Sequence, residues 1–185
     1  IENSRNIEII NAIFNFYSLN NKTSKCQFDM AFKMLINQYY EKNYSKEQYL
    51  NILSRFIEID SFDVCHIDGF SCNLLINSCE LNEIEVVEIL IKYEKVDVNS
   101  YELLQGNTPL MVAINENNLQ IAKLLIDCDR VNINQNNYNK ETALIFAVQK
   151  KFNDIVKIII SDKKFDPIES RLDYAFYLSE GEITE

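Results

Sequence analysis

The stretch that decides the fold is Gly106-Asn107-Thr108-Pro109-Leu110-Met111-Val112-Ala113, part of which returns 34 residues later as Thr142-Ala143-Leu144 with Ala147. A threonine hydroxyl accepts backbone N–H groups that are unpaired where a helix begins, and proline at the first helical position loses no hydrogen bond. Alanine at the last position lets neighbouring helices approach closely. We therefore expect the same short helix to begin at each copy, and a period of this length predicts stacked repeats.

A second apolar pattern keeps nearly the same spacing. Apolar residues at i, i+1, i+4 and i+5 form one broad stripe on a helix. Three such stripes occur: Val86, Val87, Leu90 and Ile91; Ile121, Ala122, Leu125 and Ile126; Ile155, Val156, Ile159 and Ile160. A short extended tract follows each stripe, at 96–99, 131–134 and 165–168, and an earlier copy of the tract lies at 62–65. The repeated unit is therefore predicted to be two helices followed by a turn-forming tract.

With these residues the chain resembles the ankyrin repeat family, whose signature is roughly Gly-x-Thr-Pro-Leu-His-x-Ala, then a second helix and Asp-Val-Asn. The opening stretch matches all but the histidine, while the copy that begins at Lys140 departs more and the copy that begins at Phe70 departs most. Asn82, Asn117 and Lys151 stand where the family usually has a glycine between its helices. The resemblance implies an all-α fold, a helix-turn-helix solenoid with short β-hairpin or turn connections and a helical N-terminal cap.

The domain organisation follows from the same landmarks. Amphipathic segments at 28–41 and at Gln48–Glu58 predict the two helices of a degenerate repeat, and an apolar pattern around Ile7 to Tyr17 predicts a helix before it. The expected divisions are an N-terminal helical cap at 1–27, a degenerate first repeat at 28–69, repeats at 70–105, 106–139 and 140–168, and a C-terminal segment at 169–185. A last helix around Leu172, Ala175, Phe176 and Leu178 either caps the array or begins a truncated repeat, and an acidic tail follows it.

Composition restricts the partners and the compartment. The chain has 185 residues and a net charge of −10, which disfavours nucleic acid and anionic membrane surfaces because both are negatively charged. No stretch reaches the length of a membrane span or resembles a signal peptide. Five cysteines without a C-x-x-C pair are expected to be reduced, which favours the cytoplasm, with the nucleus as the alternative. Because the chain begins at Ile1 instead of Met, we expect either a fragment or a processed chain, and a removed leader stays an alternative. The high Asn and Ile content is typical of an A/T-rich genome, such as that of a single-celled eukaryote.

No reaction centre is expected. Cys65 and His66 are adjacent, whereas a nucleophile and its base normally come from separate parts of a fold. The glycines are isolated, so no phosphate-binding loop is predicted, and a single histidine gives little support for a zinc site. We therefore predict no catalytic, cofactor or metal site, and a chain that is not an enzyme. A deep pocket containing His66 would favour the remaining alternative, an enzyme or ligand-binding protein.

The resemblance implies an adaptor that binds a protein partner on a concave face made by the turn tips and first helices, and the acidic charge suits a partner with a basic surface. The expected contact residues are Phe70, Tyr101, Leu103, Leu104, Gln105, Asn107, Asn115, Glu116, Asn137, Tyr138, Asn139, Glu141, Gln149 and Lys150, with Cys72, Glu80 and Leu81 at related positions. Aromatic and apolar residues at turn tips are typical interface anchors, although they also fold back onto neighbouring turns. The alternative is a structural spacer, or a module that self-associates through Leu172 and Phe176.

Overall fold

The computed structural model describes residues 45–58 and 74–180. The chain divides into two compact units, residues 1–70 and 71–185, and each is considered by itself below. All the secondary-structure elements of the described residues are helices, which agrees with the predicted all-α class. The predicted N-terminal cap at 1–27 and the helix at 28–41 lie outside the described residues, as does the tract at 62–65.

The described part of the first unit is one amphipathic helix, α3 (Lys46–Ile57). Ser45 and Gln48 form a capping box: the Gln48 side chain accepts the Ser45 N–H at 3.0 Å, and the Ser45 hydroxyl accepts the Gln48 N–H at 3.3 Å. Tyr49 and Leu53 are buried on one face, one helical turn apart. The predicted helix at Gln48–Glu58 is thus confirmed, and it begins two residues earlier because Ser45 provides the cap.

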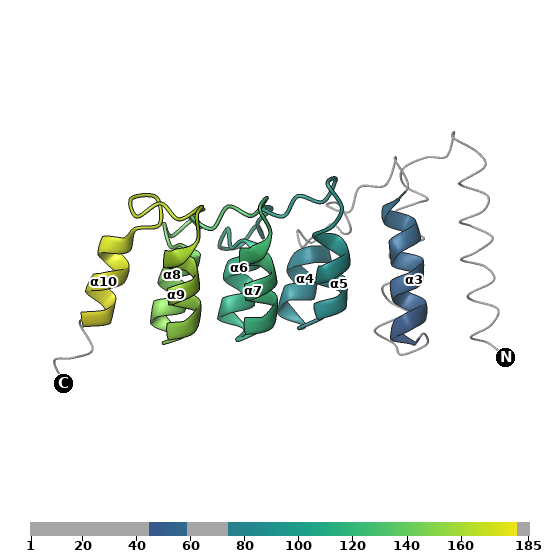
Figure 1. Cartoon of the computed structure of the whole chain (residues 1–185), viewed down its shortest axis with the longest axis horizontal. Helices are drawn as coiled ribbons and strands as arrows, with labels where there is room; N and C mark the ends of the chain where they lie inside the picture. The colour runs from purple at the N-terminus through teal and green to yellow at the C-terminus, as the bar shows by residue number, and fades with distance from the viewer. Residues whose placement is uncertain (1–44, 59–73, 181–185) are drawn as a thin grey trace. The chain divides into compact units, whose positions relative to one another are not determined.

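The second unit stacks helix pairs. The pairs are α4 (Leu74–Glu80) with α5 (Ile84–Leu90), α6 (Pro109–Asn115) with α7 (Leu119–Asp127), and α8 (Ala143–Gln149) with α9 (Asn153–Ser161), and α10 (Leu172–Glu180) follows. The first helices contact one another in the order α4, α6, α8, α10, and the second helices in the order α5, α7, α9. Figure 1 shows these helices side by side with the long connecting turns at one end. This arrangement is the predicted helix-turn-helix solenoid.

The first helices of the two best-preserved copies begin as the sequence predicts. Thr108 and Thr142 lie in extended backbone, and their hydroxyls accept the N–H groups of Met111 and Ile145, each at 3.4 Å. Pro109 is the first residue of α6. The alanines at the end of the repeated stretch are completely buried, so the first helices pack closely against their neighbours.

The turns between the two helices of each pair contain a residue with positive φ. These residues are Asn82, Asn117 and Lys151, with φ of 58°, 61° and 60°. The family usually has glycine here because a residue without Cβ adopts this conformation readily. Asparagine tolerates it better than most residues, whereas lysine has no such advantage. This chain therefore keeps the turn between the two helices without the usual glycine.

Two asparagine side chains join successive long turns. The Asn99 amide donates to the Arg130 carbonyl at 2.8 Å, and its oxygen accepts the Asn132 N–H at 2.6 Å. One unit later, Asn134 donates to the Lys164 carbonyl at 2.7 Å and accepts the Asp166 N–H at 3.0 Å. Each asparagine thereby satisfies backbone groups of the next turn that have no strand partner. At the next equivalent position the chain has Ile168, which is 87% exposed, so this series of hydrogen bonds ends there.

A cation from each following unit also covers the end of a second helix. The Arg130 guanidinium donates to the carbonyls of Ile91 at 2.8 Å and Val96 at 2.8 Å, beyond the end of α5. The Lys164 ammonium donates to the carbonyls of Ile126 at 2.6 Å and Cys128 at 2.9 Å, at the end of α7. Carbonyl groups at a helix C-terminus lack partners and carry partial negative charge, so a cation there is stabilising.

The long connections are turns. No β-strand occurs in residues 74–180, so of the two expected kinds of connection, hairpin or turn, these residues have turns, whose ends are hydrogen-bonded by side chains. The tracts at 96–99 and 131–134 keep their predicted role, because Val96, Val98, Val131 and Ile133 are all buried beneath the turns. Within the described residues no helix has the length and apolar character that a membrane span requires.

Candidate functional site

Four apolar side chains are exposed on two successive long turns. We call Tyr101, Leu103, Leu104 and Tyr138 the tip cluster. Leu104 is 93% exposed, and Leu103 and Tyr138 are each more than half exposed. Turn tips are usually polar, and apolar side chains in contact with water do not stabilise the fold. The cluster is therefore available for contact with another molecule.

The tip that carries Leu104 is held by the carboxylate of Glu102. This carboxylate accepts the N–H groups of Leu104, of Gln105 at 2.9 Å and of Asn107 at 3.1 Å. The Glu102 carbonyl also accepts the Gly106 N–H at 3.0 Å. These bonds fix the backbone under an exposed leucine. The role of Glu102 was not predicted from the sequence, although an acidic residue at the start of a turn is a signal that could have indicated it.

Tyr138 connects the two tips. Its N–H donates to the Gln105 carbonyl at 2.8 Å, and its ring lies against Gly106, where an added Cβ would be 2.7 Å from the ring. The Tyr138 ring also meets the Tyr101 ring edge to face, with 6.0 Å between the centroids. The turn-tip aromatics thus fold back in part onto neighbouring turns, while Tyr101 stays 49% and Tyr138 58% exposed.

Two of the expected contact residues, Asn107 and Asn137, are buried, so we withdraw them from the partner-binding set. The Asn137 amide donates to the Asn107 oxygen at 2.8 Å and to the Glu141 carboxylate at 3.1 Å. The Asn137 oxygen accepts the N–H groups of Asn139 at 3.0 Å and Glu141 at 2.8 Å. Both asparagines serve the fold, because they satisfy the backbone of adjoining turns.

The other expected residues divide into two groups. Gln105 and Asn139 are exposed on the turns beside the tip cluster, and Glu141 is half-buried there. Asn115, Glu116, Gln149 and Lys150 are exposed where α6 and α8 end. The two groups are separated by the length of a first helix, about 10 Å for seven residues. Glu80 is exposed at the end of α4 and Leu81 is exposed just after it, while Phe70 and Cys72 lie outside the described residues.

Burial and one ion pair shift the pKa of titratable groups in the described residues. Burial raises the pKa of the Cys79 thiol well above its usual range. Lys163 lies 2.8 Å from Asp129, and this hydrogen bond and charge lower the pKa of the Asp129 carboxyl. Within residues 45–58 and 74–180, no three potential ligands are grouped closely enough to hold a metal ion. Cys65 and His66 lie outside these residues.

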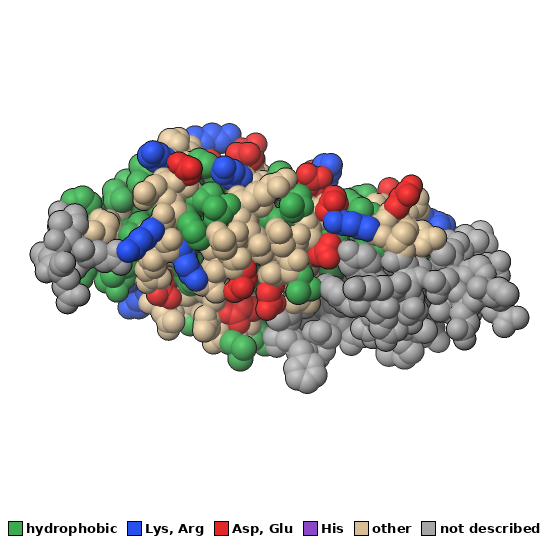
Figure 2. Space-filling model, turned by 90° about the horizontal axis from the view of Figure 1, so that it is seen from below, with side chains coloured by type: hydrophobic (Ala, Val, Ile, Leu, Met, Phe, Trp, Pro, Cys, Tyr) green, Lys and Arg blue, Asp and Glu red, His purple; other side chains and the backbone are tan. Residues whose placement is uncertain are grey.

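Charges of both signs are distributed over the second unit. Figure 2 shows the molecule from the side opposite the long turns, and acidic and basic side chains of the described residues are interspersed there. Hydrophobic side chains gather toward the α10 end of the same view. The acidic side chains of the described residues therefore do not form one large patch on this face.

The repeats now identify the class of protein. A family model described as ankyrin repeats (3 copies) matches residues 42–137 and 75–171, more than half of the chain. The chain belongs to the ankyrin repeat family.

Three curated proteins are similar in sequence to part of this chain. The chain is 38% identical over 81 residues to alpha-latrotoxin-Lg1a of Latrodectus geometricus, which covers 43% of this chain and 6% of the toxin. It is 28% identical over 91 residues to alpha-latroinsectotoxin-Lt1a of Latrodectus tredecimguttatus, covering 44% and 6%. It is 29% identical over 89 residues to I-Kappa-B like protein G2 of Microplitis demolitor bracovirus (isolate Webb), covering 47% and 52%. The matched part therefore spans about half of the viral protein and a small part of each toxin.

Membership of the family gives the function at a coarse level. Ankyrin repeats are protein–protein interaction modules, and the family is generally non-catalytic. Which surface binds and which partner is bound depend on the side chains that this chain places on the repeat framework.

Proposed function

We propose that this chain is a non-catalytic adaptor domain that captures a protein partner through the tip cluster and the adjoining face of the first helices. The observation that carries the proposal is Leu104, a leucine that is 93% exposed on a turn fixed by three hydrogen bonds to Glu102. Gln105 and Asn139 provide polar groups at the edge of the cluster. Asn115, Glu116, Gln149 and Lys150 extend the surface along the first helices.

The rigidity of the tips supports this proposal. Binding loses free energy when a mobile loop must become ordered, so anchors on a fixed backbone bind more tightly. Here Tyr138 packs on Gly106 and contacts Tyr101, while Glu102 holds the turn that carries Leu104. Aromatic anchors with a polar edge are typical of interface hot spots, where one residue contributes about 2 kcal/mol or more.

The net charge of the chain indicates which kind of partner it attracts. A net charge of −10 speeds the approach of a basic partner and slows that of nucleic acid. We therefore favour a protein with a basic surface whose contact region contains an apolar residue for Leu104. The cytoplasm or the nucleus is the compartment that we favour.

The double substitution Leu104→Ala and Tyr138→Ala tests the proposal. A tagged chain is used to capture partners from the cells that express it, and the captured proteins are identified by mass spectrometry. We expect the wild-type chain to enrich a specific partner and the double variant to lose it while circular dichroism verifies that the variant keeps its helices. The matched control is Ile168→Ala, which removes an apolar side chain that is 87% exposed on another turn and is not among the expected contact residues. Equal capture by all three proteins would contradict a role for the tip cluster.

A different observation favours the alternative function, a spacer or a self-associating module. Apolar side chains are also exposed at the α10 end, among them Phe176 at 61%. Concentration-dependent association that is lost when Leu172 and Phe176 are replaced by polar residues would favour that function.

A further inference from the structure

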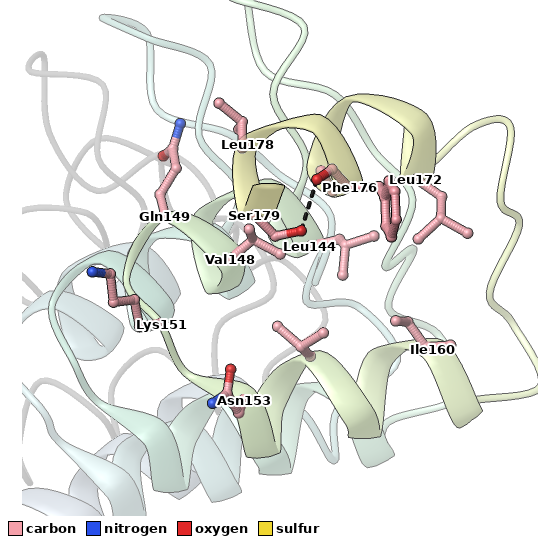
Figure 3. Close-up of a pocket in the computed structure, with 12 residues that line it drawn as sticks. Leu144, Val148, Gln149, Lys151, Asn153, Ile160, Leu172, Phe176, Leu178 and Ser179 are labelled. Atoms are coloured by element: carbon pink, nitrogen blue, oxygen red, sulfur yellow. Dashed lines mark hydrogen bonds between the residues drawn. The ribbon is translucent and has the colours of Figure 1, made fainter. Parts of the chain in front are cut away.

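We draw no further inference here: the strongest candidate, the apolar groove of about 460 Å³ that Leu144 of α8, Ile160 of α9 and Phe176 of α10 line at the α10 end of the second unit (Figure 3), carries none, because nothing in the structure shows what covers it.

Discussion

Residues with positive φ control the turns of this chain, and only one of those in the described residues is a glycine. Gly106 has φ of 76°, and Lys140, its equivalent 34 residues later, has φ of 61°. The two positions are geometrically alike but differ in strain, because a residue with a Cβ is disfavoured in this conformation by about 1–2 kcal/mol. The repeat has therefore kept its backbone path after the glycine was replaced.

Lys140→Gly is accordingly expected to stabilise the protein. The gain in free energy of unfolding should be up to about 1 kcal/mol, since relief of strain outweighs the greater freedom of glycine in the unfolded chain. Urea unfolding measures it. The reverse change, Gly106→Ala, should destabilise by more than about 1 kcal/mol, because the added Cβ meets the Tyr138 ring as well as the unfavourable φ. If both variants had the same stability as the wild type, the two turns would not have the conformations described.

Cys79 is expected to resist thiol reagents in the native protein. It is completely buried in α4, and burial raises the pKa of its thiol, so the thiolate fraction is negligible at pH 8. Cys128 is partly exposed and serves as the internal comparison. Alkylation followed by mass spectrometry should modify Cys128 well before Cys79, and denaturant should remove the difference. Equal rates without denaturant would contradict the burial of α4.

The sequence predicted the role of a residue correctly where that role involves only its neighbours in the chain. The caps at Thr108 and Thr142 were predicted correctly, because a cap involves only the first turn of the same helix. Asn107 and Asn137 were assigned to the surface and are buried, because their hydrogen bond joins two units that are 30 residues apart in sequence. A polar side chain at a turn looks the same in sequence whether it faces water or the next turn.

At the scale of elements, the apolar periodicity predicted the helices but not the contacts between elements of different repeats. The stripes of α5, α7 and α9 were all predicted, as was α10. The asparagine bridges and the cations at helix ends were not recognised, since each joins elements from different units. The apolar spacing of α9 likewise matches that of α7, although only α7 is covered by a following helix. Periodicity reports which face is apolar, and tertiary stacking decides whether that face is buried.

Asn134→Ala should reveal what one bridge contributes. The asparagine is buried and bonds to the Lys164 carbonyl, the Asp166 N–H and the Ser170 hydroxyl, so its loss leaves several polar groups unpaired. We expect a loss of about 2–4 kcal/mol in the free energy of unfolding, measured by urea denaturation. Asn136→Ala, at an exposed position two residues later, is the matched control and should change the free energy by less than about 0.5 kcal/mol. Equal effects would mean that the bridge adds nothing to turn stacking.

At the scale of the molecule, the second unit is a one-dimensional stack in which each helix pair contacts only its neighbours. Its stability is then approximately the sum of what each pair contributes and what each junction contributes. This arrangement places the two exposed apolar surfaces at different positions along the stack. The tip cluster lies in the middle of the stack, where both sides are supported, and the apolar groove lies at α10, where one side is open.

The contribution of α10 to the stack can be measured with Ala175→Asp. Ala175 is 2% exposed in α10, which packs on α8, and a carboxylate buried there without a partner is strongly unfavourable. Because α10 can separate from α8 to hydrate the charge, the observed loss cannot exceed the free energy with which α10 docks. We expect about 2–4 kcal/mol by urea unfolding, together with faster amide exchange in α10 and α8 than in α4. Tyr177→Asp is the control, because Tyr177 is 70% exposed on the same helix and its replacement should cost less than about 1 kcal/mol. If the two aspartates had equal effects, α10 would not be part of the cooperative stack, and the groove beside α9 would lose one of its walls.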